Sequence, residues 1–196
     1  MDKFTKVVKT QNIQTQKDID SVVYKGQYMN VIKQNEYEFI NENDTIVCLV
    51  YIKDEGYMLM RSEPVTGWQY KQKNDINKLS GLFLTVISGT IEKGESPQSC
   101  LRRELYEEAG LVLNEFKQFD IEGGFYKSKG TDSQYYTCLL ELNYNDYRMV
   151  AAPGDGSKKE KLSRTVKISV GDIDEIKCND MVSKFLIDKM KNEYNL

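Results

Sequence analysis

The sequence has 196 residues, enough for one domain with a buried core. Hydrophobic residues make up 40% and charged residues 29%, which excludes a disordered composition, and no apolar run is long enough to span a membrane. The formal net charge of -3, from 27 basic and 30 acidic side chains, argues against a partner as long and as negative as nucleic acid.

The absence of histidine excludes Ser-His-Asp and Cys-His hydrolases, so any proton transfer must use carboxylates, lysines, tyrosines or a metal-bound water. The four cysteines form no CxxC pair, and we expect reduced, packed thiols at Cys48, Cys100, Cys138 and Cys178. The N-terminal residues are polar and lack a secretory signal, which predicts a cytoplasmic protein.

The first half of the chain predicts strands. Residues 20–40 alternate loosely and favour two antiparallel strands, and the apolar run 44–52 indicates a buried central strand. A turn at 54–56 leads into a further strand. Residues 62–80 form a long polar segment, typical of a functional loop, in which Trp68 and Tyr70 could stack on a purine base or anchor the loop by packing.

The second half alternates strands with two helices. Strands are predicted at 82–89, 116–126, 134–143 and 164–170. The last segment has apolar residues at helical spacing, with Asn179 or Asp180 as its N-cap. Many strands and two helices favour an α+β sandwich over a doubly wound sheet.

The stretch "GTIEKGESPQSCLRRELYEEAGL" carries the clearest local signals. Ser96 can cap a helix, Pro97 suits its first position, and Gly110 suits its end. On the helix between them, Glu104 and Glu108 lie one turn apart on one face.

Glu107 lies beside this acidic pair, and Glu95 lies just upstream in the loop. One interpretation is a solvated face neutralised by nearby basic residues. The other is a metal cradle, because glycines at 89 and 94 would let the backbone turn and aim the Ser88 carbonyl at the acids. Oxygen ligands of this kind suit Mg²⁺ or Mn²⁺, and we favour the cradle.

The same stretch resembles the Nudix box: Gly, five residues, Glu, seven residues, Arg-Glu-aliphatic, any residue, Glu-Glu, any residue, Gly-aliphatic. The positions that fill this pattern are Gly89, Glu95, Arg103, Glu104, Leu105, Glu107, Glu108, Gly110 and Leu111. The resemblance implies a Nudix-type α/β/α sandwich with a mixed β-sheet, in which residues 43–196 form the hydrolase domain and residues 1–42 supply N-terminal strands for a dimer or substrate contact.

The resemblance also implies roles for single residues. Glu104 and Glu108 would be principal metal ligands, with Glu107 as a further ligand and a catalytic residue. Arg103 would orient the catalytic glutamates, and Glu95 would pair with Arg103 and support the loop. Together with Mg²⁺ or Mn²⁺, this set implies hydrolysis of a nucleoside diphosphate linked to another group.

Flanking segments are similar to the ADP-ribose pyrophosphatase branch of the family, which implies AMP and a sugar phosphate as products and a possible homodimer. Glu160 would be the general base, with Asp155 in reserve. Lys127 and Lys129 stand where that branch has prolines, so the sugar is in question, and Lys127 could contact an extra phosphate or simply be solvated. Other nucleotide sugars, dinucleoside polyphosphates and a non-catalytic nucleotide sensor stay open as alternatives.

Overall fold

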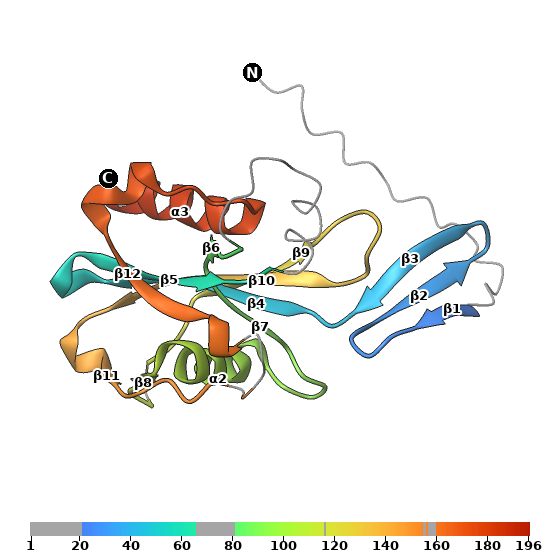
Figure 1. Ribbon diagram of the computed structural model, residues 1–196, viewed down its shortest axis with the longest axis horizontal. Helices are drawn as coiled ribbons and strands as arrows, with labels where there is room; N and C mark the ends of the chain where they lie inside the picture. The colour runs from blue at the N-terminus through green and yellow to red at the C-terminus, as the bar shows by residue number, and fades with distance from the viewer. Residues whose placement is uncertain (1–20, 66–80, 116, 155, 157–159) are drawn as a thin grey trace, which may run out of the picture.

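The computed structural model describes residues 21–65, 81–115, 117–154, 156 and 160–196. Its centre is a mixed sheet of seven strands, in which only β4 and β10 run parallel (Figure 1). The main strand order is β12 (Arg164–Ser169), β5 (Tyr57–Glu63), β4 (Thr45–Ile52), β10 (Gln134–Leu142) and β9 (Ile121–Tyr126). Two short strands complete it: β6 (Phe83–Thr85) pairs with β5, and β7 (Ile87–Thr90) pairs with β4.

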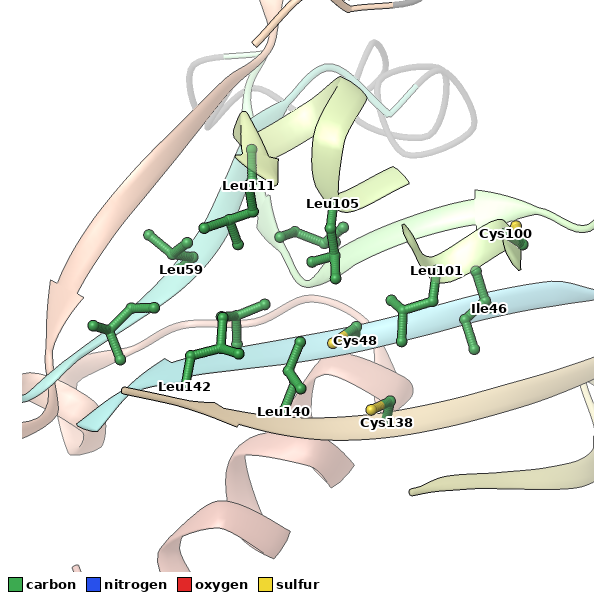
Figure 2. Close-up of a cluster of buried hydrophobic side chains, with 14 of the residues drawn as sticks. Ile46, Cys48, Leu59, Cys100, Leu101, Leu105, Leu111, Cys138, Leu140 and Leu142 are labelled. Atoms are coloured by element: carbon green, nitrogen blue, oxygen red, sulfur yellow. The ribbon is translucent and has the colours of Figure 1, made fainter. Parts of the chain in front are cut away.

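One helix covers each face of this sheet, α2 (Pro97–Ala109) on one side and α3 (Met181–Tyr194) on the other (Figure 1). Strand β4 has a hydrophobic residue at every position from 46 to 52, because this part of it is buried on both faces. Its residues Ile46 and Cys48 pack in the cluster with α2, which Figure 2 shows, whereas Val47 and Leu49 pack in the cluster with α3. This confirms the predicted α/β/α sandwich.

The predicted strand at 82–89 is two strands, because the chain changes partner at Val86. The backbone N–H of Val86 donates to Ser183 Oγ on α3 at 3.1 Å and so leaves the sheet ladder. Strand β6, before Val86, pairs with β5, and strand β7, after it, pairs with β4. The exchange brings Ser88 and Gly89 of β7 next to helix α2.

The N-terminal segment forms three strands, not the two expected: β1 (Ser21–Lys25), β2 (Met29–Gln34) and β3 (Tyr37–Glu42). They make a separate antiparallel sheet beside the main body (Figure 1). Gly26 allows the first turn, where a Cβ would lie 2.7 Å from the Met29 carbonyl oxygen, and Asn35 has the positive φ of 56° that the second turn needs.

This small sheet is tied to the loop between β9 and β10. Ile40 exchanges backbone hydrogen bonds with Gly130 and Asp132, and Glu42 accepts from Ser133 Oγ at 2.8 Å. Lys127 forms an ion pair with Glu42 at 3.2 Å, so it serves the junction of the two sheets.

The remaining elements are short. Strands β8 (Leu111–Leu113) and β11 (Tyr147–Met149) pair with each other beyond the end of α2. Short 3-10 helices lie at Lys53–Glu55, Tyr144–Asp146, Glu160–Leu162 and Val170–Glu175. Within the described ranges, neither helix has the length and apolar character needed to cross a membrane. All four cysteines are free thiols, and Cys178 alone is only partly buried.

Candidate active site

Helix α2 begins and ends where its sequence predicts. Ser96 caps it by accepting the Ser99 backbone N–H at 3.1 Å, and Pro97 is its first residue. Gly110 follows it with φ of 65°, the left-handed conformation that glycine adopts without strain. Cys100, Leu101 and other apolar residues of α2 pack against the sheet, so the acidic residues between them are held at fixed positions on the helix.

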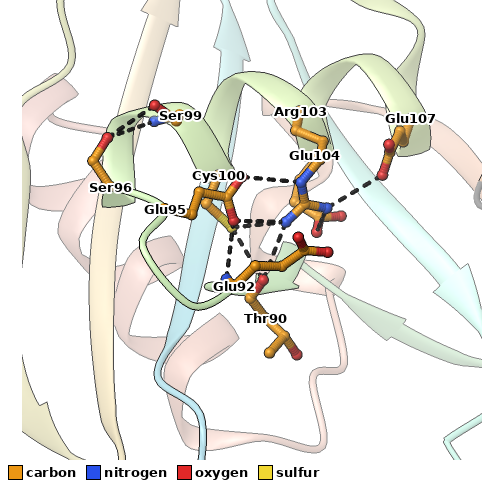
Figure 3. A network of polar contacts seen from close by, with 9 residues as sticks. All are labelled: Thr90, Glu92, Glu95, Ser96, Ser99, Cys100, Arg103, Glu104 and Glu107. Atoms are coloured by element: carbon orange, nitrogen blue, oxygen red, sulfur yellow. Dashed lines mark hydrogen bonds and ion pairs between the residues drawn. The ribbon is translucent and has the colours of Figure 1, made fainter.

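Arg103 lies at the centre of a polar network that contacts three of these acids (Figure 3). Its guanidinium donates to both carboxylate oxygens of Glu95, at 3.1 and 3.0 Å, in the paired geometry that arginine favours. The same group donates to Glu104 at 2.6 Å and to Glu107 at 3.3 Å. One cation thus fixes the loop acid and two helix acids relative to each other.

Further contacts attach the loop to the helix. Glu95 accepts the Glu92 backbone N–H at 3.0 Å, and Arg103 also donates to the Thr90 carbonyl at 3.1 Å (Figure 3). The hydrogen bonds from Arg103 hold the pKa of Glu95 below its usual range. Gly94 has φ of 85°, so this turn requires a residue without a Cβ, as expected from the sequence.

Gly89 has a different reason to be glycine. It lies in strand β7 with no left-handed φ, and a Cβ on it would be 1.9 Å from Glu104 Oε1. The Glu104 carboxylate therefore occupies the space that a side chain at position 89 would fill. Glu104 is only 8% exposed, which an acid side chain tolerates only with partners such as Arg103.

Glu108 is held from the opposite side, by strand β5. Arg61, only 2% exposed, lies 3.5 Å from the Glu108 carboxylate and also donates to the Glu108 backbone carbonyl at 3.0 Å. Thr165 of β12 donates to the same carbonyl at 2.6 Å. The carboxylate also accepts the Ser88 backbone N–H at 3.3 Å, so Ser88 does lie beside this acid.

Burial raises the pKa of both principal acids. The pKa of Glu104 rises to about 7 and that of Glu108 to about 8, because little water reaches either carboxylate. Negative charge on neighbouring acids adds to this effect, from Glu107 and Glu95 on the pKa of Glu104 and from Glu104 and Glu63 on that of Glu108. A cation between the carboxylates would relieve this repulsion, as the metal-cradle interpretation requires.

The donor chemistry fits a hard divalent cation. Glu104, Glu107 and Glu108 offer carboxylate oxygens and Ser88 a backbone carbonyl, which are the ligands that Mg²⁺ and Mn²⁺ prefer. In the part of the chain that the structure describes, no three acidic or thiol side chains already converge as a ligand set. Arg103 instead binds Glu104 and Glu107, and Arg61 binds Glu108.

A cleft of about 510 Å³ opens beside Glu108, between α2, β5 and β12. The loop after β11 forms one wall, since Val150 donates its N–H to the Gly110 carbonyl at 2.8 Å and Gly154 to that of Glu107 at 3.0 Å. Gly110 also makes room for this loop, because a Cβ there would lie 2.1 Å from the Val150 carbonyl oxygen. These contacts hold the loop after β11 against the C-terminal end of α2.

The other predicted site residues lie elsewhere or outside the described residues. Lys127 is engaged with Glu42 and does not line this cleft. Glu160 starts the 3-10 turn Glu160–Leu162, whose Lys161 lines the cleft. Trp68, Tyr70 and Asp155 fall outside the described residues.

Arg61 and Glu63 were not predicted from the sequence as site residues. Both are buried charged residues in β5, and they lie on the same face of the strand as Tyr57 and Leu59, which pack in the cluster with α2. Glu63 accepts from Thr85 Oγ1 at 2.8 Å. A charged residue at every second position of an apolar strand, in phase with its core-facing residues, is the signal that could have found them.

Comparisons with known proteins bear on the fold and the family of the chain. The chain resembles a solved structure described as "Crystal structure of ADP compounds hydrolase", with a TM-score of 0.62 and 15% sequence identity over 90% of this chain and 93% of that one. At this identity the likeness shows the fold alone. The family model described as the NUDIX domain matches residues 42–163, a range that holds α2, its loop, Arg61 and the turn at Glu160. The chain therefore belongs to the NUDIX domain family of hydrolases.

Proposed function

We propose that this protein hydrolyses the pyrophosphate bond of a nucleoside diphosphate derivative with the help of Mg²⁺ or Mn²⁺. ADP-ribose or a related nucleotide sugar is the proposed substrate, giving AMP and a sugar phosphate. The observation that carries the proposal is the arrangement of Glu104, Glu107 and Glu108 around α2, two of them in the Arg103 network and the third held by Arg61.

In the proposed reaction, the residues that would hold the ion are Glu104, Glu107, Glu108 and the Ser88 carbonyl. A bound divalent ion supplies charge neutralisation for the diphosphate and lowers the pKa of the attacking water. Arg103 keeps Glu104 and Glu107 in position by its contact with Glu95, and it presents a positive charge on the same side. The chain needs no histidine and no covalent intermediate for this chemistry.

We propose Glu160 as the general base, with Asp155 in reserve. The 3-10 turn that Glu160 begins leads directly into β12, whose Thr165 contacts the end of α2. The next residue, Lys161, lines the cleft that Glu108 also lines. The backbone at Glu160 therefore lies close to the cleft beside Glu108, which supports the assignment. Glu160→Gln tests it, and we expect kcat to fall while KM stays near the wild-type value.

The N-terminal sheet is proposed as the contact between two copies of the chain. It exposes a run of large apolar side chains, including Tyr28 at 83% and Tyr37 at 77%. Apolar residues gathered in this way on one small sheet are typical of an interaction surface. A cytoplasmic location belongs to the same proposal, supported by the four free thiols.

A substrate panel tests the proposed function. ADP-ribose, nucleotide sugars, diadenosine polyphosphates, NADH, coenzyme A and capped RNA are incubated with Mg²⁺ or Mn²⁺, and the nucleotide products are separated by chromatography. AMP released chiefly from ADP-ribose supports the proposal. If nucleotide products come chiefly from diadenosine polyphosphates, the substrate class is dinucleoside polyphosphates instead. Tight binding of a ligand without hydrolysis supports the alternative of a nucleotide sensor.

A further inference from the structure

The cleft beside Glu108 is unusually basic for a chain with a net charge of -3. Among the described residues that line it, Glu108 is the only acid, whereas four are cationic: Arg61, Lys161, Arg164 and Lys167. A concentration of positive charge that opposes the sign of the whole molecule marks a surface that attracts anions.

Two of these cations have fixed positions. Arg61 is bound to Glu108 and Thr165 at the inner end of the cleft. Lys167 lies two residues along β12 from Thr165, on the same face of the strand, with its ammonium 4.1 Å from the centre of the Tyr57 ring and 3.7 Å from Glu55. Its charge is therefore held at the outer end of the cleft.

Lys161 and Arg164 differ from these two. Both are exposed, and neither side chain has a hydrogen-bond or ion-pair partner among the described residues. Positive charges that line a cleft without a protein anion to neutralise them are available to a ligand. A phosphate group with several acceptor oxygens suits them better than a neutral sugar does.

The cleft also lacks what a nucleobase needs. None of the described lining residues is aromatic, so no ring is present on which a purine could stack. The lining is instead cationic and polar, and it includes Ser163 and the glycine backbone at 154 and 156 beside the four cations. These groups match a hydroxylated, anionic moiety.

We propose that this cleft receives the non-nucleoside end of the substrate and binds an additional phosphate on it through Lys161 and Arg164. The inference rests on the proposed function, because it takes the scissile diphosphate to lie at Glu108, which borders the cleft. It narrows the substrate class to nucleoside diphosphate derivatives whose second moiety carries a further phosphate, in preference to a neutral sugar.

Paired kinetics on ADP-ribose and ADP-ribose 1''-phosphate test the inference. We expect a KM about tenfold lower for the phosphorylated compound, the size of one charge-assisted contact. In Lys161→Ala the two KM values should come within about twofold of each other, while Lys161→Arg, which keeps the charge, should retain most of the difference. Raising the ionic strength should also shrink the difference.

Lys184→Ala is the matched control. Lys184 is exposed on α3, pairs with Asp188 and lies outside the cleft, so its removal should leave the ratio of KM values unchanged. Equal KM values for the two compounds in the wild-type protein would overturn the inference and leave the proposed function intact. If neither compound is hydrolysed with Mg²⁺ or Mn²⁺, the proposed function fails and the inference fails with it.

Discussion

Replacing Gly89 by alanine would put a methyl group into the space that the Glu104 side chain fills. The new Cβ would lie 2.0 Å from the Glu104 carboxylate carbon and 2.2 Å from its Cγ. Carbon atoms in contact are normally about 3.5–4.0 Å apart, so the carboxylate must move by roughly 1.5 Å or more. Its contact with Arg103, 2.6 Å in the native protein, would then be lost or remade elsewhere.

Two effects follow from this displacement. Overpacking of a filled site costs about 1–3 kcal/mol, which lowers Tm by about 2–12 °C for a chain of this size. Misplacement of a catalytic group by about 1 Å can cost about 100-fold in rate, so kcat should fall by at least that factor at a temperature where the variant is folded. Circular dichroism and initial-rate assays on the best substrate of the panel measure the two effects separately.

Gly56→Ala is the control for Gly89→Ala. Gly56 lies in the turn before β5 with φ of 66°, and a Cβ added to it would meet no other atom within 4 Å. Left-handed strain should cost about 1–2 kcal/mol there, so Tm should fall while kcat stays near the wild-type value. Wild-type kcat in Gly89→Ala would refute the reasoning, because the position of Glu104 would then not matter for the reaction.

Three further changes have defined outcomes. Arg103→Lys removes the paired contact with Glu95 and should lower kcat about 10–100-fold in rate assays, with KM less affected. The pKa of Glu104 is about 7 and that of Glu108 is about 8. In metal-free buffer between about pH 5 and 8, the folded state therefore keeps protons on these two acids that the unfolded state has released. Stability should therefore fall as pH rises from about 5 to 8, and Mg²⁺ should reduce this fall, as thermal melts with EDTA or Mg²⁺ can show. Ser96→Ala removes the helix cap and should lower Tm by about 2–4 °C without changing kcat.

Local rules were enough to predict helix α2 and its acidic face. Ser96, Pro97 and Gly110 act on the backbone next to them, so their effect can be read from neighbouring residues alone. Strand β4 was predictable for a similar reason, because burial on both faces favours the continuous hydrophobic run that it has from 46 to 52.

Features that depend on distant partners were not predictable in this way. The break at Val86 arises from Ser183, far along the chain, which takes the N–H that a continuous strand would have used. Arg61 gains its role from Glu108 on α2 and Thr165 on β12, and neither partner is visible in the local pattern of β5. The reason for Gly89 likewise depends on Glu104, although the resemblance to the Nudix box identified the position.

The most direct test of the account compares the wild-type protein with Glu108→Gln on ADP-ribose, with and without Mg²⁺, by chromatography of the nucleotide product. The variant keeps the size of the side chain and an oxygen acceptor for the Ser88 N–H, so it should fold. The account predicts AMP from the wild-type protein only when Mg²⁺ is present, and a loss of turnover by orders of magnitude in the variant. Equal turnover by both proteins at saturating Mg²⁺, or AMP formation without any divalent ion, would contradict it.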